Sequence, residues 1–248
     1  MEIQHVANYI SAFLTVTYLV VVLSFIRGWH QLKTVKPVLK RGNTPVSIIV
    51  AARNEEAQIA KTIEDILAQD YDANLMEVIF IDDHSTDQTA QIIARYPRIK
   101  LISLNEPITI NSYKKKAIET AIGGASGKLI ITTDADCLMG PNWLKTIVSY
   151  YEEHDFKMIS SPVLYTAEQN FFERAQSLEF LYLIGLGAST IGNNQPSTCN
   201  GANLTYERAA FYEVGGFKGI DDLASGDDEL LLHKMAARYG NKIGFLKN

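Results

Sequence analysis

Two acidic residues at the end of an apolar run are the clearest chemical signal in this sequence. Residues 129–133 are apolar and β-branched, as in a buried strand, and they lead directly into Asp134 and Asp136. Side chains two residues apart point to the same side of a strand, so both carboxylates can turn into one cleft. Two neighbouring oxygen ligands suit Mg²⁺ or Mn²⁺, which keep several waters and bind phosphates with only one or two carboxylates. Taken alone, the pair would equally fit a solvated turn, so its meaning depends on the segments around it.

Two earlier apolar runs also end in polar residues. Residues 46–52 and 77–81 are apolar except for Ser47 and Glu77, as expected for buried strands. The residues that close or follow them are Ala51, Arg53 and Glu55 for the first run, and Asp82 and Asp83 for the second. Ligands of open α/β sheets bind outside the carboxyl ends of the strands, so we expect these clusters to form one site. No G-x-G-x-x-G or G-x-x-x-x-G-K-[ST] motif follows the first run, which argues against a dinucleotide oxidoreductase or a P-loop enzyme.

Predicted strands and helices alternate along the chain. The strands are expected over 46–52, 77–81, 100–103 and 128–133, and the helices over 54–67, 86–96, 114–123 and 142–153. Ser85 or Thr86 is expected to cap the second helix, with Asp87 near its positive end. Such alternation is typical of an α/β fold with a mostly parallel sheet.

The composition narrows the classes of protein to consider. A chain of 248 residues is long enough for one large α/β domain with a sizeable core. Its net charge of −5 gives no case for a nucleic-acid partner. Cys137 and Cys199 are the only cysteines and have no metal-ligand spacing, so we expect two reduced thiols.

The N-terminal residues differ from the rest of the chain. Residues 6–26 carry no charge, and a helix of that length at 1.5 Å per residue approaches the roughly 30 Å of a bilayer core. Basic residues follow this stretch and none precedes it: Arg27, Lys33, Lys36, Lys40 and Arg41. The positive-inside bias therefore places the remaining chain in the cytoplasm, behind a single N-terminal span. The alternative is a buried core helix.

Five segments together resemble glycosyltransferase family 2, whose catalytic domain has the GT-A fold. In order they are PVSIIVAARNEE, VIFIDDHSTDQT, KKKAIETAIGGASGKLIITTDADC, CNGANLTYERAAFYEVGGF and SGDDELL. The resemblance implies a Rossmann-like, mostly parallel nucleotide-diphospho-sugar transferase fold and sugar transfer from a nucleotide-sugar, commonly with inversion, using Mg²⁺ or Mn²⁺. It also implies a membrane-anchored, bacterial-type hexosyltransferase of the cell (inner) membrane, acting in cell-envelope polysaccharide synthesis. We accordingly expect a transmembrane helix over 1–27, a basic linker over 28–44 and a catalytic GT-A domain over 45–248.

The resemblance also implies which residues meet the donor. They are Ala51, Arg53, Glu55, Asp82, Asp83, Lys114, Asp134 and Gly201. Asp83 would accept from the N3–H of a uracil, with Asp82 sharing the task, and the small Gly201 would let backbone amides approach the sugar or phosphate. Lys114 would reach the phosphates. Plainer alternatives stay open: Asp83 as a helix cap, Glu55 as a first-turn acid, and Lys114 as part of a solvated lysine cluster.

The metal ligand and the general base follow from the same resemblance. Asp136 would make the direct metal bond, while Asp134 faces the ribose or the water shell of the metal. Asp227 takes the position of the base that receives the acceptor's proton, with Asp228 as the second choice. Gly226 stands where the family carries Glu, and an acid-rich helix start is the alternative reading. A single displacement assisted by one base predicts inversion.

Three further questions stay open at this point. Residues 171–190 are apolar with an amphipathic rhythm, and form either a core helix or an interfacial helix near lipid-borne acceptors. Arg208 is either a donor contact or a surface residue at a helix start. No Q-x-x-R-W motif is present, so the chain is either a fragment or a member of a shorter branch. The expected activity is transfer from a UDP-sugar to a lipid or glycan acceptor; the alternative is a membrane-tethered nucleotide-sugar binding module without turnover.

Overall fold

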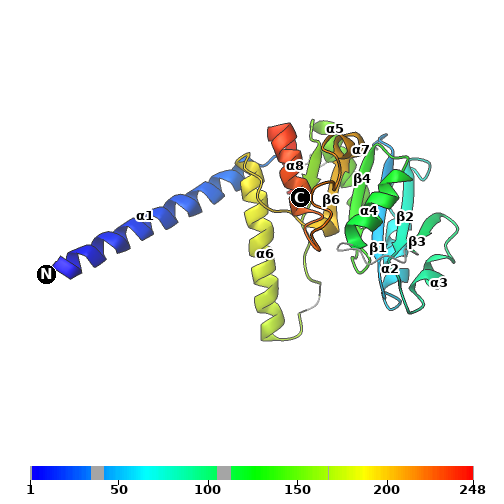
Figure 1. Ribbon diagram of the computed structural model, residues 1–248, viewed down its shortest axis with the longest axis horizontal. Coiled ribbons are helices and arrows are strands. Elements are labelled where there is room, and N and C mark those ends of the chain that lie inside the picture. Colours follow the sequence, from blue (N-terminus) through cyan, green and yellow to red (C-terminus); the bar gives the residue numbers. More distant parts are fainter. Residues whose placement is uncertain (1, 35–41, 105–112, 167, 248) are drawn as a thin grey trace.

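A rounded α/β body carries one long projecting helix, α1 (Glu2–Gln31) (Figure 1). The computed structural model describes residues 2–34, 42–104, 113–166 and 168–247. Three basic residues of the predicted linker, Lys36, Lys40 and Arg41, lie outside the described residues.

The described strands form one seven-stranded sheet in the order β3-β2-β1-β4-β6-β5-β7. Their bounds are β1 (Val46–Ala52), β2 (Met76–Asp82), β3 (Ile99–Ser103), β4 (Leu129–Asp134), β5 (Met158–Ser160), β6 (Leu204–Glu207) and β7 (Ile243–Phe245). The first four strands are parallel neighbours, whereas β6 runs antiparallel to both β4 and β5. The predicted mostly parallel sheet is therefore confirmed, and β5, β6 and β7 extend it beyond what the sequence pattern predicted.

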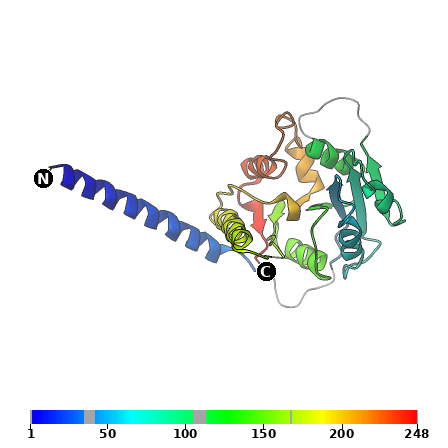
Figure 2. The ribbon, with the colours of Figure 1, turned by 90° about the horizontal axis from the view of Figure 1, so that it is seen from below.

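Helices cover both faces of this sheet (Figure 2). They are α2 (Ile59–Leu67), α3 (Thr89–Ile93) and α5 (Trp143–Glu153) on one face, and α4 (Tyr113–Gly123), α7 (Arg208–Glu213) and α8 (Glu229–Tyr239) on the other. Because successive strand residues point to opposite faces, Ile48 and Val50 of β1 pack in the first layer and Ile49 packs in the second. Burial on both faces explains why these strands are largely apolar.

Two predicted helices begin later than the sequence suggested. Asn54 adopts a left-handed conformation with φ 57°, and its side chain accepts a hydrogen bond from the Thr86 amide at 2.8 Å. Residues 54–58 are therefore a loop tied to the neighbouring turn, and α2 starts only at Ile59. The N-cap of α3 is Gln88, so the prediction of a Ser85 or Thr86 cap is wrong. Ser85 instead accepts from the Asn54 amide at 3.1 Å.

Helix α1 is long and apolar enough to cross a membrane, by length and composition. None of its apolar stretch is buried, so the alternative of a buried core helix is wrong. Only its C-terminal end touches the body: a side chain at Gly28 would overlap the Ser189 carbonyl oxygen, and Asn193 donates to the Ser24 carbonyl at 2.8 Å. The helix continues past the predicted boundary at residue 27 to Gln31.

The partner of α1 in this contact is α6 (Phe171–Gly192). Its Asn170 cap accepts from the Glu173 amide at 3.0 Å, which fixes where the helix begins. Only four of its residues are buried, and all lie in its last turns: Gly187, Ala188, Ser189 and Ile191. The core-helix interpretation is therefore wrong for the first two thirds of α6.

Candidate active site

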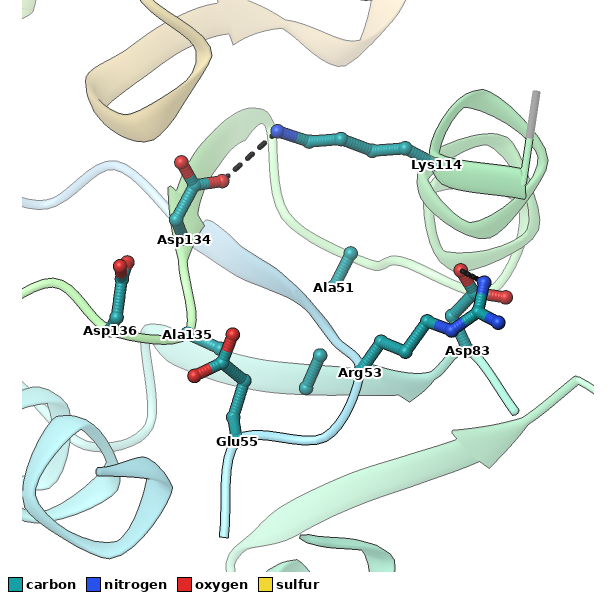
Figure 3. A pocket seen from close by; sticks show the side chains of 9 residues that line it. Ala51, Arg53, Glu55, Asp83, Lys114, Asp134, Ala135 and Asp136 are labelled. Atoms are coloured by element: carbon teal, nitrogen blue, oxygen red, sulfur yellow. Dashed lines mark hydrogen bonds and ion pairs between the residues drawn. The ribbon is translucent and has the colours of Figure 1, made fainter. Parts of the chain in front are cut away.

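The carboxyl ends of β1, β2 and β4 meet at one edge of the sheet. The strand register sets Ala51 opposite Asp134 and Ala52 opposite Asp82. A cavity of about 330 Å³ opens there, lined by Ala51, Ala52, Arg53, Glu55, Asp83, Lys114, Asp134, Ala135 and Asp136 (Figure 3). Of the predicted site residues, Asp82, Gly201, Asp227 and Asp228 do not line this cavity.

Asp83 and Arg53 lie on one side of the cavity (Figure 3). The Arg53 guanidinium is 3.9 Å from the Asp83 carboxylate, and His84 Nδ1 lies 2.9 Å from the other Asp83 oxygen. His84 is a loop residue with φ 56°, and its ring meets Tyr113 edge-on. Asp83 is thus held between two basic groups and does not cap a helix. Asp82 instead accepts from the Ser85 amide at 3.3 Å and stabilises the turn.

Glu55 and Asp136 face each other on the opposite side (Figure 3). The Glu55 amide donates to Thr89 Oγ1 at 2.8 Å, which holds the loop after β1 in place. Partial burial raises the pKa of the Glu55 carboxyl, and the charges of Asp136, Asp87 and Asp134 raise it further. Negative charge therefore accumulates at this end of the cavity.

This end of the cavity fits a hard divalent cation. Asp136 is exposed and, among the described residues, takes part in no hydrogen bond or ion pair, so its oxygens are free to bind. No group of three or more His, Cys, Asp or Glu side chains that could hold a metal occurs in the described part of the chain. A complete protein-built cage is not needed, because Mg²⁺ and Mn²⁺ sites use one or two carboxylates and fill the remaining positions with water and phosphate oxygens.

Lys114 connects the cavity to a further carboxylate. Its ammonium group is 3.0 Å from Asp134 and 3.7 Å from Asp227. Burial disfavours the charged lysine, but the charges of Asp227 and Asp134 outweigh it and raise the pKa of Lys114. The side chain is therefore a fixed positive charge between the end of β4 and the segment before α8.

Asp227 and Asp228 have different environments. The Asp227 side chain is only 14% exposed, and burial raises the pKa of its carboxyl, although Lys114 opposes this shift. Asp228 is the N-cap of α8 and accepts from the Glu229 amide at 2.7 Å and the Gly201 amide at 2.8 Å. Asp228 thus has a structural task at the start of α8, whereas Asp227 lies beside Lys114.

The backbone amide of Gly201 is hydrogen-bonded within the protein and is not free to contact a nucleotide-sugar. That amide is bound by Asp228, and the Gly201 carbonyl accepts from Thr132 Oγ1 at 2.9 Å. The Gly201 amide is therefore not the one that would contact the sugar or phosphate, and the role of Gly201 in letting backbone amides approach them stays a prediction.

Comparison with known proteins agrees with this geometry. The family described as Glycosyl transferase family 2 matches this chain over residues 47–215. The chain belongs to this family. It is 30% identical over 161 residues to a beta-monoglucosyldiacylglycerol synthase of Nostoc sp., covering 62% of this chain and 33% of that protein. It is 29% identical over 208 residues to the enzyme of the same name from Synechocystis sp., covering 82% of this chain and 42% of that protein.

The chain spans less than half the length of these two relatives. A solved mannosyltransferase from Pyrobaculum calidifontis, in complex with GDP-Man and Mn²⁺, superposes with a TM-score of 0.65 at 21% identity. That match covers 90% of this chain and 63% of the mannosyltransferase. The fold is therefore the predicted GT-A fold of glycosyltransferase family 2.

A second, larger groove adjoins the first cavity in this family 2 chain. It measures about 690 Å³ and shares Asp134 and Asp136 with the cavity. Its other lining residues are largely apolar or aromatic and include Trp143, Leu164, Tyr165 and Phe180. No sequence pattern predicts this groove, because residues 162–166 show neither strand nor helix periodicity.

Arg208 and the two cysteines do not line the first cavity, although Cys137 lines the larger groove. Arg208 begins α7, and its guanidinium donates to the Ala125 carbonyl at 2.6 Å, at the opposite end of β4 from the cavity. Cys137 and Cys199 are free thiols, as predicted. Burial raises the pKa of both thiols, which keeps them protonated and poorly nucleophilic.

Lys115 differs sharply from its neighbour Lys114. It is almost completely buried, and its ammonium group donates to the carbonyls of Ile220, Leu223 and Ser225 at 2.6, 2.8 and 2.7 Å. These three carbonyls belong to the loop that leads into Asp227. Lys115 therefore fixes this loop against α4. Lys114 instead pairs with Asp134 and Asp227, so the two neighbouring lysines have different roles.

Replacing Lys115 with Met should destabilise the fold by about 3 kcal/mol, because it leaves three carbonyls of the loop without their donor. Thermal or denaturant unfolding of the detergent-solubilised protein measures this loss. Lys61→Met is the matched control, because Lys61 is exposed and pairs only with Asp65 one turn away, a contact of about 0.5 kcal/mol. Equal stability of the two variants would contradict the role assigned to Lys115.

Proposed function

We propose that this chain transfers a sugar from a nucleotide-sugar, preferably a UDP-sugar, to a lipid or lipid-linked glycan. The proposed reaction is metal-dependent and inverts the anomeric carbon, with Asp227 as general base. One observation carries the proposal: Lys114 lies between Asp134 of the cavity and the largely buried carboxylate of Asp227, and pairs with both. Family membership and the GT-A fold support the same reaction class.

The donor's nucleoside is assigned to the side of the cavity near Asp83. Its carboxylate accepts from the N3–H of a uracil, while the exposed Arg53 guanidinium lies 3.9 Å away and can stack on the base face. The diphosphate then extends toward Lys114 and Asp136 across the cavity floor at Ala51.

Asp136, assisted by Asp134, would hold the divalent cation. When bound, such a cation neutralises the charge that develops on the leaving nucleoside diphosphate. Lys114 adds a second positive charge beside Asp134, and it stays fixed there because both acids hold it. Charge stabilisation at the leaving group therefore comes from preformed groups that need little rearrangement.

Asp227 serves the acceptor. As the acceptor oxygen forms its bond to the anomeric carbon, its proton passes to the Asp227 carboxylate and the bond to the diphosphate oxygen breaks. The raised pKa of this buried carboxyl improves it as a proton acceptor near neutral pH. Since one displacement occurs from the face opposite the leaving group, the product has the inverted configuration.

The acceptor is assigned to the larger apolar groove. Its lining combines aromatic and aliphatic side chains with polar ones such as Asn200 and Asn203, which suits a lipid-linked molecule that has both apolar and polar parts. The two cyanobacterial relatives are named as synthases of a glycolipid, which supports this class. Helix α1 would anchor the chain in the cell membrane, with the body on the cytoplasmic side.

The pH dependence of transfer offers a test of the base. Asp227 must be ionised, so the rate falls as the pH drops through its pKa. Lys114 lowers that pKa and Asp228 raises it. We expect Lys114→Met to move the acidic limb of kcat/KM to higher pH and Asp228→Asn to move it to lower pH. Shifts in the same direction for both variants would contradict this assignment.

Calorimetric titration with UDP, GDP and dTDP tests the donor site. We expect one nucleoside diphosphate, preferably UDP, to bind with Mn²⁺ and to bind much more weakly with chelator. Asp83→Asn should weaken UDP binding, because an amide offers one carbonyl oxygen and no charge to the N3–H. Absence of any nucleotide binding in the presence of Mn²⁺ would contradict the proposal.

A further inference from the structure

We infer that α6 lies in the membrane interface and turns one apolar face into the lipid, so that the larger groove opens at the level of the headgroups. This inference rests on the proposed membrane anchoring by α1. It concerns a helix that meets the proposed acceptor groove through Phe180 and supplies no residue to the donor cavity.

The exposed side of α6 is broad and mostly apolar, because Phe172, Leu181 and Leu183 are exposed, at 69%, 51% and 49%. Phe171, Leu178 and Tyr182 are 86%, 69% and 60% exposed, and their spacing of seven and four residues puts them on one side of the helix. Arg174 and Glu179 stand on either flank of this face, where their charged ends can stay at the water boundary. We call Phe171, Leu178 and Tyr182 the exposed face of α6.

The exposed face of α6 is continuous with the contact to α1. Further along the same side of the helix, the backbone of Ser189 packs directly against Gly28 of α1, where a Cβ would overlap the Ser189 carbonyl oxygen. Between these points, Tyr182 and Trp29 line an apolar cavity of about 340 Å³ formed by the two helices. The same side of α6 that packs on α1 near its end is therefore the side left uncovered near its start.

The direction of α6 fits an in-plane helix. In Figure 1 it runs across the direction of α1, and in Figure 2 it is seen nearly along its own axis beside the end of α1. It lies between α1 and the rest of the body in both views. With α1 along the membrane normal, α6 therefore lies along the membrane surface, as interfacial helices do.

The opposite side of α6 connects this surface to the proposed acceptor site. Phe180 lines the larger groove, and its ring lies 5.0 Å from that of Tyr165, another lining residue. A bilayer is the occupant we assign to the exposed face, because this face continues directly into a helix that has the length and composition of a membrane span. A lipid-borne acceptor would then enter the groove beside α6 without leaving the interface.

Site-directed fluorescence in vesicles tests this placement. Single cysteines are introduced at Leu178, at the exposed polar residue Gln176 of the same helix, and at Leu14 of α1, in a Cys137→Ser, Cys199→Ala background. Each carries an environment-sensitive label, and the full chain is reconstituted in phosphatidylethanolamine and phosphatidylglycerol vesicles. Quenching by lipid-borne nitroxides is compared with quenching by aqueous iodide, and thermal unfolding confirms that each labelled variant is folded.

We expect labels at 178 and 14 to be quenched mainly by the lipid-borne nitroxide and the label at 176 mainly by iodide. Iodide quenching at 178 with lipid quenching at 14 would overturn the inference and leave the membrane anchor intact. Shielding of 178 from both quenchers would also overturn it, because a protein surface would then cover the helix. Iodide quenching at 14 would overturn the membrane anchoring itself, while the nucleotide titrations would still test the catalytic proposal independently.

Discussion

Asp227→Asn is expected to lower the rate of sugar transfer about a thousandfold, within the range that removal of a general base produces. The carboxylate is buried beside Lys114, so its replacement removes the proton acceptor while changing the shape of the site little. Because Asp227 does not line the donor cavity, nucleoside diphosphate binding should change by only a few-fold. Transfer kinetics and calorimetry on the same variant measure the two effects separately.

Asp228→Asn is the matched control for this prediction. Asparagine caps helices about as well as aspartate, so the start of α8 should persist, although one of the two amide hydrogen bonds is lost because Asp228 accepts from the Glu229 and Gly201 amides with different oxygens. We expect this variant to keep most of its activity at a pH above the acidic limb. If Asp228→Asn lost activity and Asp227→Asn kept it, the general base would have to be assigned to Asp228.

Asp136→Asn is expected to weaken metal-dependent binding of the nucleoside diphosphate about a hundredfold, which corresponds to the loss of roughly 3 kcal/mol at a Lewis-acid site. Asp136 has no hydrogen-bond or ion-pair partner among the described residues, so its neutralisation should not disturb the fold. Binding titrations with Mn²⁺ and with chelator isolate the metal-dependent part.

Asp82→Asn serves as the control carboxylate for this measurement. Asp82 lies at the same edge of the sheet but holds the turn at Ser85 and does not line the cavity. An asparagine oxygen can still accept from that amide, so metal-dependent binding should persist. Unchanged metal-dependent binding in Asp136→Asn would rule out its role as the metal ligand.

Much of the fold and of the cavity could be predicted because strong local patterns encode them. The strands over 46–52 and 77–81 are buried on both faces, and such strands need largely apolar runs. Their shared parallel direction then brings Asp83, Asp134 and Asp136 to one edge of the sheet. These residues do line one cavity, although their roles in binding await the measurements above.

Other features depend on contacts that no local pattern reveals. Strands β5 and β7 have three residues each, which is too short for periodicity to show. The late start of α2 depends on the bond between Asn54 and Thr86, a pair 32 residues apart in sequence. The burial of Lys115 likewise depends on carbonyls more than a hundred residues away.

The larger groove and the exposure of α6 were equally hidden in the sequence. The sequence pattern of an apolar helix of this length is the same whether the helix packs in a core or contacts lipid, because both environments select apolar side chains. The exposure of most of α6 and its position between α1 and the body distinguish the two.

The most direct test of the central claim is nucleoside diphosphate release by the purified chain in detergent. The assay screens UDP-, GDP- and dTDP-sugars with membrane lipid extract, in Mn²⁺, in Mg²⁺ and in chelator. We predict metal-dependent release from one donor, together with appearance of its sugar in the lipid fraction. Donor binding without release in any of these conditions would contradict sugar transfer and would indicate a binding module without turnover.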